Sequence, residues 1–120
     1  MIIAVNGSKK FDDYSIFLSG MSKAMFVMDQ EDRQIFLYTA GPRRVNEMAM
    51  EFANVSERGL KARGVRIQVR KVPTGWIWDN FHFLDFFAYF AVEREPIPSI
   101  VHSAQAKDVQ AEIFRFKNVA

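Results

Sequence analysis

Residues 1–11 read MIIAVNGSKKF, a short apolar run that ends in a turn of small residues. The run is built from β-branched and small apolar residues without polar alternation, which is typical of a strand buried in a parallel sheet. In open α/β sheets a ligand binds beyond the carboxyl ends of the strands, where loop amides and helix N-termini attract anions. We therefore expect a binding site to begin at Asn6, Gly7 and Ser8.

Strand and helix patterns alternate through the first half of the chain. Apolar residues recur at three- and four-residue spacing in two segments, which is typical of helices with one buried face. The expected elements are a strand within residues 1–5, a helix over 13–28 capped by Asp12 or Asp13, a strand over 35–38, a helix with Pro42 at its first position that runs to Arg63 before Gly64, and a strand over 65–72 nearer a sheet edge. Strands that alternate with helices favour a parallel sheet with right-handed crossovers. The sequence predicts an α/β protein, a three-layer Rossmann-like fold with a mostly parallel central sheet.

An aromatic-rich segment, Trp76–Phe90, comes next and is expected to form a further helix. It carries more aromatic side chains than one face of a helix can bury in a small domain. Core packing explains several of them, and the surplus predicts a self-association or partner surface, because aromatic residues are enriched in interface cores. The residues assigned to this surface are Trp76, Trp78, Phe83 and Phe87. A polar, proline-marked connection at 93–98, a short helix over 99–107 and a strand over 111–116 complete the expected elements.

The composition is that of an ordinary folded domain. The 120 residues are 49% apolar and 25% charged, so we expect one domain over residues 1–120 with one sustained core. Cysteine is absent, which excludes disulfides and thiolate metal sites and agrees with a reducing compartment. The sequence shows no signal peptide and no apolar run long enough to span a bilayer, so we expect a cytoplasmic protein without membrane contact.

The net charge of +2 is small, but basic residues are concentrated in one stretch without acidic neighbours. The members of this stretch are Arg58, Lys61, Arg63, Arg66, Arg70 and Lys71. One interpretation is a surface that faces anions or nucleic acid. The other is a solvated helix end and strand edge, where cations complement the helix dipole.

Two motifs carry a resemblance to a known family. Residues 6–14, NGSKKFDDY, and 39–49, TAGPRRVNEMA, resemble the SLOG superfamily, in the branch that opens with Gly-Ser-Arg-x-Phe and has a Tyr in the first helix. The resemblance covers residues 1–73. It implies a Rossmann-like domain that binds a nucleotide or nucleotide-derived ligand, as a sensor or a sequestering protein. Short stand-alone members occur in bacteria and their phages, so a phage accessory protein in the host cytoplasm is one expectation.

The motifs predict a cradle for phosphate and sugar at the ends of the first two strands. Glycine at positions 7 and 41 permits close backbone approach, the Ser8 hydroxyl can donate to phosphate, and Arg43 can grip it with a bidentate fork. Asn46 stands where the family has Asp and can bind a ribose hydroxyl. The expected ligand-binding residues are Asn6, Gly7, Ser8, Lys9, Phe11, Thr39, Gly41, Arg43, Arg44 and Asn46. The alternative is that both glycines only serve turns and that Ser8 only caps locally.

Three departures from the family pattern weaken the case for catalysis. Lys9 replaces an Arg, Arg44 replaces a glycine and can fill ligand space, and Asn46 lacks the carboxylate that could act as a base. The hydrolase motif Pro-Gly-Gly-x-Gly-Thr-x-x-Glu does not occur, and neither His82 nor His102 has metal-ligand spacing.

Three functions remain open at this point. The first is nucleotide-ligand binding without a catalytic residue, cofactor or metal. The second is an interaction module, such as a homo-oligomer, on a degenerate Rossmann scaffold that uses residues 76–90. The third, a nucleotide-processing hydrolase, would need Asn46 and Glu47 to replace the family's acidic residues.

Overall fold

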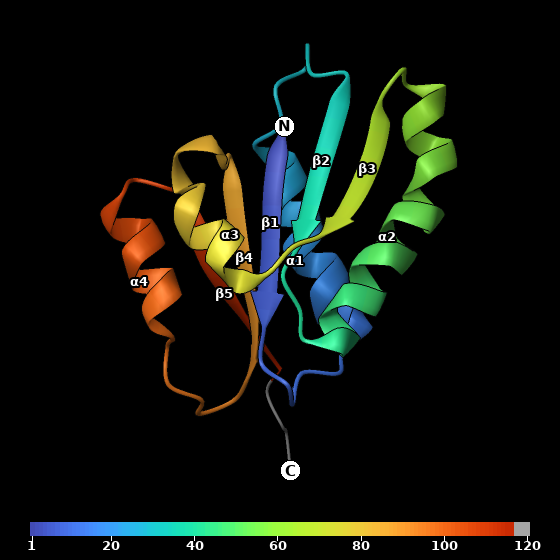
Figure 1. The fold of residues 1–120 in the computed structure, drawn as a ribbon. Helices are drawn as coiled ribbons and strands as arrows, with labels where there is room; N and C mark the ends of the chain where they lie inside the picture. Colours follow the sequence, from blue (N-terminus) through green and yellow to red (C-terminus); the bar gives the residue numbers. More distant parts are fainter. Residues whose placement is uncertain (117–120) are drawn as a thin grey trace.

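The computed structural model describes residues 1–116, and its strands form one parallel sheet flanked by helices (Figure 1). The strands lie in the order β3-β2-β1-β4-β5. The elements are β1 (Ile2–Gly7), α1 (Tyr14–Phe26), β2 (Gln34–Thr39), α2 (Arg43–Ala62), β3 (Arg66–Lys71), α3 (Thr74–Asp79), the 3-10 turn η1 (Phe81–Phe83), β4 (Phe86–Val92), α4 (Ser99–Ala106) and β5 (Ala111–Phe116). All four strand pairings are parallel, which confirms the predicted three-layer α/β fold. Residues 117–120 of the expected domain lie outside the described residues.

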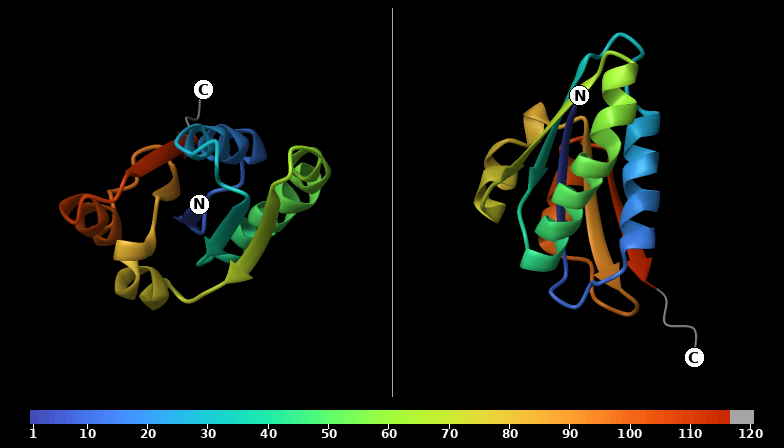
Figure 2. Two further views of the ribbon diagram at one scale, coloured as in Figure 1. Left: turned by 90° about the horizontal axis from the view of Figure 1, so that it is seen from above. Right: turned by 90° about the vertical axis from the view of Figure 1, so that its right-hand side faces the viewer.

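Helices lie on both sides of the sheet, as Figure 2 shows from above. α1 and α2 cover one face, and their apolar stripes pack with residues of β1, β2 and β4 such as Ile3, Leu37 and Phe90. α3 and α4 cover part of the other face, where Ala4 and Phe87 belong to a second apolar cluster. The sheet therefore separates two cores, as in other doubly covered parallel sheets.

The start of α1 and the end of α2 lie where the sequence indicates, whereas α1 ends at Phe26, two residues before the expected end. α1 begins after Asp13, whose carboxylate accepts a hydrogen bond from the amide of Ile16 at 2.9 Å, so Asp13 is the cap. α2 ends before Gly64, which has a φ of 77°, a conformation that glycine adopts without strain. Pro42 is the residue that precedes α2 and not its first residue, because its ψ of 176° is extended.

The predicted helix over residues 76–90 is wrong. The segment contains the last four residues of the short helix α3, the turn η1 and the first five residues of β4. β4 reads FFAYFAV, and five of its seven residues are fully or almost fully buried because β4 is an inner strand with cores on both faces. A continuous apolar run of this kind suits a buried parallel strand as well as a helix.

The C-terminal part agrees with the expectation. α4 spans Ser99–Ala106 and β5 spans Ala111–Phe116, where a short helix and a last strand are predicted. β3, with four of six residues exposed, is an edge strand, as its alternating polar residues indicate. None of the helices within residues 1–116 is long and apolar enough to cross a membrane.

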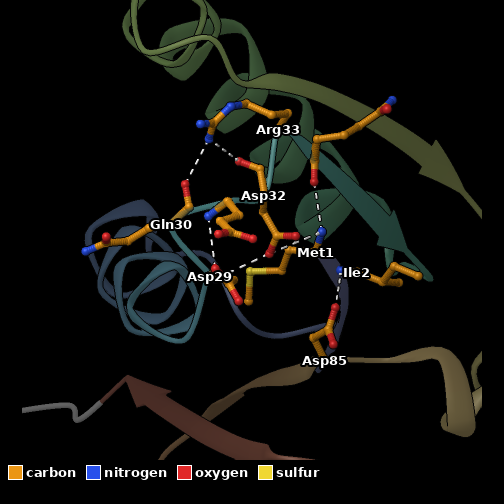
Figure 3. Close-up of polar contacts among 9 residues, drawn as sticks. Met1, Ile2, Asp29, Gln30, Asp32, Arg33 and Asp85 are labelled. Carbon is orange, nitrogen blue, oxygen red and sulfur yellow. Dashed lines mark hydrogen bonds and ion pairs between the residues drawn. The ribbon is translucent and has the colours of Figure 1, made fainter.

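The amino-terminal edge of the sheet is held by its own polar contacts (Figure 3). The Asp85 carboxylate accepts a hydrogen bond from the amide of Ile2 at 2.7 Å, and the amino group of Met1 donates to the carbonyl of Gln34 at 2.8 Å. Arg33 donates to the carbonyl oxygens of Gln30 and Asp32 in the turn before β2. These contacts lie at the end of the sheet opposite the candidate site.

Candidate functional site

The carboxyl edge of the sheet contains a topological switch point between β1 and β4. From β1 the chain proceeds to β2 and β3 on one side, and it then returns to β4 and β5 on the other side. The loops after β1 and after β4 therefore leave the sheet next to each other and in opposite directions. In open α/β sheets this divergence creates the crevice where ligands bind.

Ser8 and Glu95 meet across this switch point. The Ser8 hydroxyl donates to Oε2 of Glu95 at 2.7 Å and accepts from the amide of Lys10 at 3.1 Å. The amide of Ser8 donates to the carbonyl of Phe90 on β4 at 2.8 Å. The loop after β1 is thus attached to both the end of β4 and the loop that follows it.

The Glu95 carboxylate is held from several sides. Its Oε1 accepts from the amide of Val92 at 2.8 Å, while Arg115 donates to the carbonyl oxygens of Val92 and Glu95 at 3.2 and 2.9 Å. Burial raises the pKa of Glu95, but the hydrogen bonds from Ser8 and Val92 and the charges of Lys10 and Arg115 lower it further, so the net pKa lies below the ordinary value. Glu95 is therefore an ionised acceptor at neutral pH.

Two further polar side chains, on β4 and β1, lie at this edge of the sheet. Burial raises the pKa of Tyr89 on β4, the negative charge of Glu95 raises it further, and Arg115 opposes the shift. Asn6, in register with Tyr89, is buried, and its side-chain oxygen accepts from the amide of Gly7 at 2.7 Å. The switch point is consequently lined by hydrogen-bonding groups.

The turn between β2 and α2 is organised by Asn46. Its side-chain oxygen accepts from the hydroxyl of Thr39 at 2.6 Å and from the amide of Gly41 at 2.7 Å. Thr39 is fully buried, and Gly41 has a φ of 77° next to a cis peptide bond to Pro42. Asn46 thus joins Thr39 and Gly41, which assigns all three residues a role in shaping the turn.

Arg43 and Arg44 project from the first turn of α2 and pair with carboxylates. Arg43 is 93% exposed along its side chain, and its Nε lies 3.0 Å from Glu47. Arg44 bonds to Asp12 in the loop after β1 and to Glu47 at 3.0 Å. Hydrogen bonds from Arg44 and Arg43 lower the pKa of Glu47 despite some desolvation. No side chain caps the start of this helix, so its first amides lack a side-chain acceptor. These amides lie at the same edge of the sheet as both arginines.

Gly7 and Phe11 have packing roles. A Cβ atom at Gly7 would lie 2.8 Å from the carbonyl oxygen of Phe90 and 2.9 Å from a methyl group of Val45, so this position must be glycine for the loop to fit. The Phe11 ring is fully buried against Phe90, with centroids 5.3 Å apart. Lys9 is exposed and leaves its charge available at the edge.

The four predicted interface residues do not share one surface role. Phe87 is fully buried in the core on the α3–α4 side, so it is not available to a partner. Trp76 is partly buried and stacks on Tyr38, with ring centroids 4.2 Å apart. Trp78 and Phe83 remain exposed, at 38% and 55%. Phe87 is buried because residues 86–92 form a strand, which points this side chain into the core between the sheet and α3 and α4.

Within the described residues, no group of three or more His, Asp or Glu side chains could hold a metal ion. His82 and His102 are both exposed and lie on different elements. No protein-family model, curated protein or solved structure matches the chain.

Sequence reasoning did not find Glu95, Lys10 or Arg115 as members of the site. Glu95 lies in the proline-marked connection at 93–98, which composition alone describes as a linker. One signal was available, because a polar loop after an inner strand is where the switch-point rule places ligand contacts. Using that signal requires knowing that residues 86–92 form a strand beside β1.

Proposed function

We propose that this domain binds a phosphorylated, nucleotide-derived ligand at the carboxyl edge of β1, β2 and β4, as a sensor or sequestering protein. The observation that carries the proposal is the Ser8–Glu95 pair at the switch point, where a donor and an ionised acceptor face each other across the two diverging loops. The two SLOG-like motifs follow adjacent parallel strands, which supports a site of the SLOG type.

The residues divide between the two chemical parts of such a ligand. Lys9 and Lys10 after β1 and Arg43 at the uncapped start of α2 supply positive charge for phosphate. Glu95 supplies an acceptor for sugar hydroxyls, a role that carboxylates serve in dinucleotide-binding folds. Ligand hydroxyls would replace the Ser8 hydroxyl on Glu95, which frees Ser8 to donate to phosphate.

A thermal-shift screen of the purified protein against nucleotides, ADP-ribose and cyclic dinucleotides tests the proposal. A ligand at about one hundred times its Kd stabilises the fold by about 2.7 kcal/mol, a shift that is easily measured at this chain length. Arg43→Ala and Glu95→Gln should each weaken binding, whereas Arg58→Ala, on the exposed surface of α2, should leave it unchanged.

The outcomes separate the alternatives. A shift that survives both Arg43→Ala and Glu95→Gln would place the ligand elsewhere. A screen without any shift would contradict the proposal, and the Tm of each unliganded variant controls for loss of folding.

A second candidate function rests on the exposed Trp78 and Phe83. Large aromatic side chains at the surface are typical of interaction sites. A self-associating domain would show a concentration-dependent mass in sedimentation, and Trp78→Ser with Phe83→Ser would return it to a monomer. A monomeric unmodified protein at high concentration would remove this candidate as a homo-oligomer.

A further inference from the structure

One face of β2 and β3 lies beside α3 and α4 rather than beneath them, and α3 reaches it through Trp76, which stacks on Tyr38. α3 and α4 pack on an apolar cluster that includes Ala4, Phe87 and Ala111, on β1, β4 and β5. No helix of the described residues runs across β2 and β3 on this side, and the segment from β3 to α3 crosses near the carboxyl end of β2 (Figure 1). An open sheet face of this kind presents side chains in a regular, flat array.

The residues of this open face follow from strand alternation and register. The intervening residues of β2 and β3, such as Leu37 and Val69, belong to the core under α1 and α2. The remaining residues point the other way and pair as Gln34 with Arg66, Phe36 with Gln68 and Tyr38 with Arg70. We call these six residues the open face.

Two aromatic groups lie in line along β2. Phe36 is partly buried but belongs to neither apolar cluster, so its ring rests on the sheet surface. Tyr38, two residues on, stacks on Trp76 at an interplanar angle of 23°. The Cα atoms of residues i and i+2 along a strand are about 6.6 Å apart. Two successive planar groups of a ligand could therefore each contact one of the two rings, Phe36 or Tyr38.

Positive charge accompanies these rings. Arg66 and Arg70 are exposed, and no ion pair engages them within the described part of the chain. No acidic residue occurs between positions 58 and 78, and Lys71 adds a further cation at the end of β3. Asp85 lies near Ile2 at the border of this face, where its carboxylate accepts a hydrogen bond from the Ile2 amide.

We propose that the open face binds single-stranded nucleic acid. Bases would stack on Phe36 and on the Tyr38–Trp76 pair, the two arginines would contact phosphates, and the amides of Gln34 and Gln68 would reach base edges. Aromatic rings interleaved with cations are the combination that single strands need, because every base has an exposed π face. This site is on a sheet face and is distinct from the carboxyl-edge ligand site.

The same observations argue against two other anionic partners. A duplex hides the faces of its bases, so it would use the arginines without Phe36. An acidic peptide would also pair with the arginines but has no planar groups to stack on both aromatic positions. Dependence on Phe36 therefore distinguishes a single strand from both.

Fluorescence anisotropy with labelled twelve-nucleotide oligomers, rU12 and dT12, tests the proposal at several salt concentrations. Arg66→Gln with Arg70→Gln should weaken binding about tenfold and reduce the slope of log K against log salt by about 1.4, since single strands contribute about 0.7 per phosphate contact. Phe36→Leu, which keeps an apolar side chain, should weaken binding about tenfold through lost stacking. The charge-matched control is Arg58→Gln with Lys107→Gln, two exposed cations away from the open face.

The affinities of the unmodified protein for different partners give a second readout. This readout does not depend on whether a variant folds correctly. The proposal expects tighter binding to either oligomer than to a duplex of equal charge or to polyglutamate. A preference for rU12 over dT12 would identify RNA as the partner, and equal binding would support either source. Equal affinity for duplex and single strand, or binding unchanged by Phe36→Leu, would overturn the proposal, as would no binding at 50 mM salt.

Discussion

The hydroxyl of Ser8 donates a 2.7 Å hydrogen bond to the carboxylate of Glu95, which lies 87 positions later in the chain. Ser8→Ala removes this bond and the acceptor for the amide of Lys10. Hydrogen bonds to charged groups contribute about 1.5–3 kcal/mol to stability. Because Glu95 is partly exposed to solvent, we expect Ser8→Ala to lower the free energy of unfolding by about 1–2 kcal/mol. Urea denaturation measures the loss, and Ser19→Ala, at an exposed serine of α1, should change stability by less than about 0.5 kcal/mol.

The lowered pKa of Glu95 predicts a pH dependence of stability. Because the folded-state pKa lies below the unfolded value, the unfolded state binds more protons and acidification favours it. The stabilisation is complete above the unfolded pKa of about 4.3 and is lost as the pH falls through the folded pKa. The stability difference between the unmodified protein and Glu95→Gln should therefore shrink between pH 6 and pH 3. A difference that is constant over this range would show that the charge of Glu95 contributes nothing.

Two helical glycines predict opposite effects of the same substitution. A Cβ atom at Gly20 of α1 would lie 2.7 Å from the ring of Phe90, whereas at Gly59 of α2 it would meet nothing within 4 Å. Gly59→Ala should stabilise the protein by about 0.5–1 kcal/mol through helix propensity. Gly20→Ala gains the same propensity but overpacks a core aromatic, so we expect a net loss of about 1–2 kcal/mol. Equal Tm shifts for the two variants would contradict the packing around α1.

The role of Asn46 can be separated from ligand binding. Asn46→Ala leaves the buried Thr39 hydroxyl without its acceptor, so we expect a loss of about 1–3 kcal/mol in unfolding free energy. Asn46→Asp keeps an oxygen at the same place and should retain most of the stability. If Asn46→Ala unfolds like the unmodified protein, the Thr39–Asn46 bond does not organise the turn.

Most of the fold was predictable because local patterns and tertiary packing agree. The buried residues Phe17, Met21 and Ala24 recur at helical spacing in α1, and Gly64 ends α2 with the positive φ expected of a terminal glycine. The prediction of a helix over residues 76–90 failed because β4 is an inner strand with both faces buried. Such a strand has no polar alternation to distinguish it from a helix.

The part of the site that follows β1 and β2 was predictable from the sequence, whereas the part that follows β4 was not. The loops that begin at Ser8 and Ala40 lie at one edge because β1 and β2 are adjacent and parallel. Glu95 joins them through the pairing of β1 with β4, a contact that no local pattern encodes. That pairing also explains why position 7 is glycine, because a Cβ atom there would collide with the carbonyl oxygen of Phe90 on β4.

The central place of β1 also affects how the chain assembles as it is made. β1 can pair with β2 early, but its other edge is completed only by residues 86–90. At the usual speed of synthesis, roughly 5–20 residues per second, that edge stays bare for roughly 4–16 s. The backbone groups that Ile3 and Val5 later pair with β4 are free to pair with other chains during this interval, and parallel pairing between distant segments is slow to form. Slower translation of the middle of the chain would lengthen the interval and increase aggregation during expression.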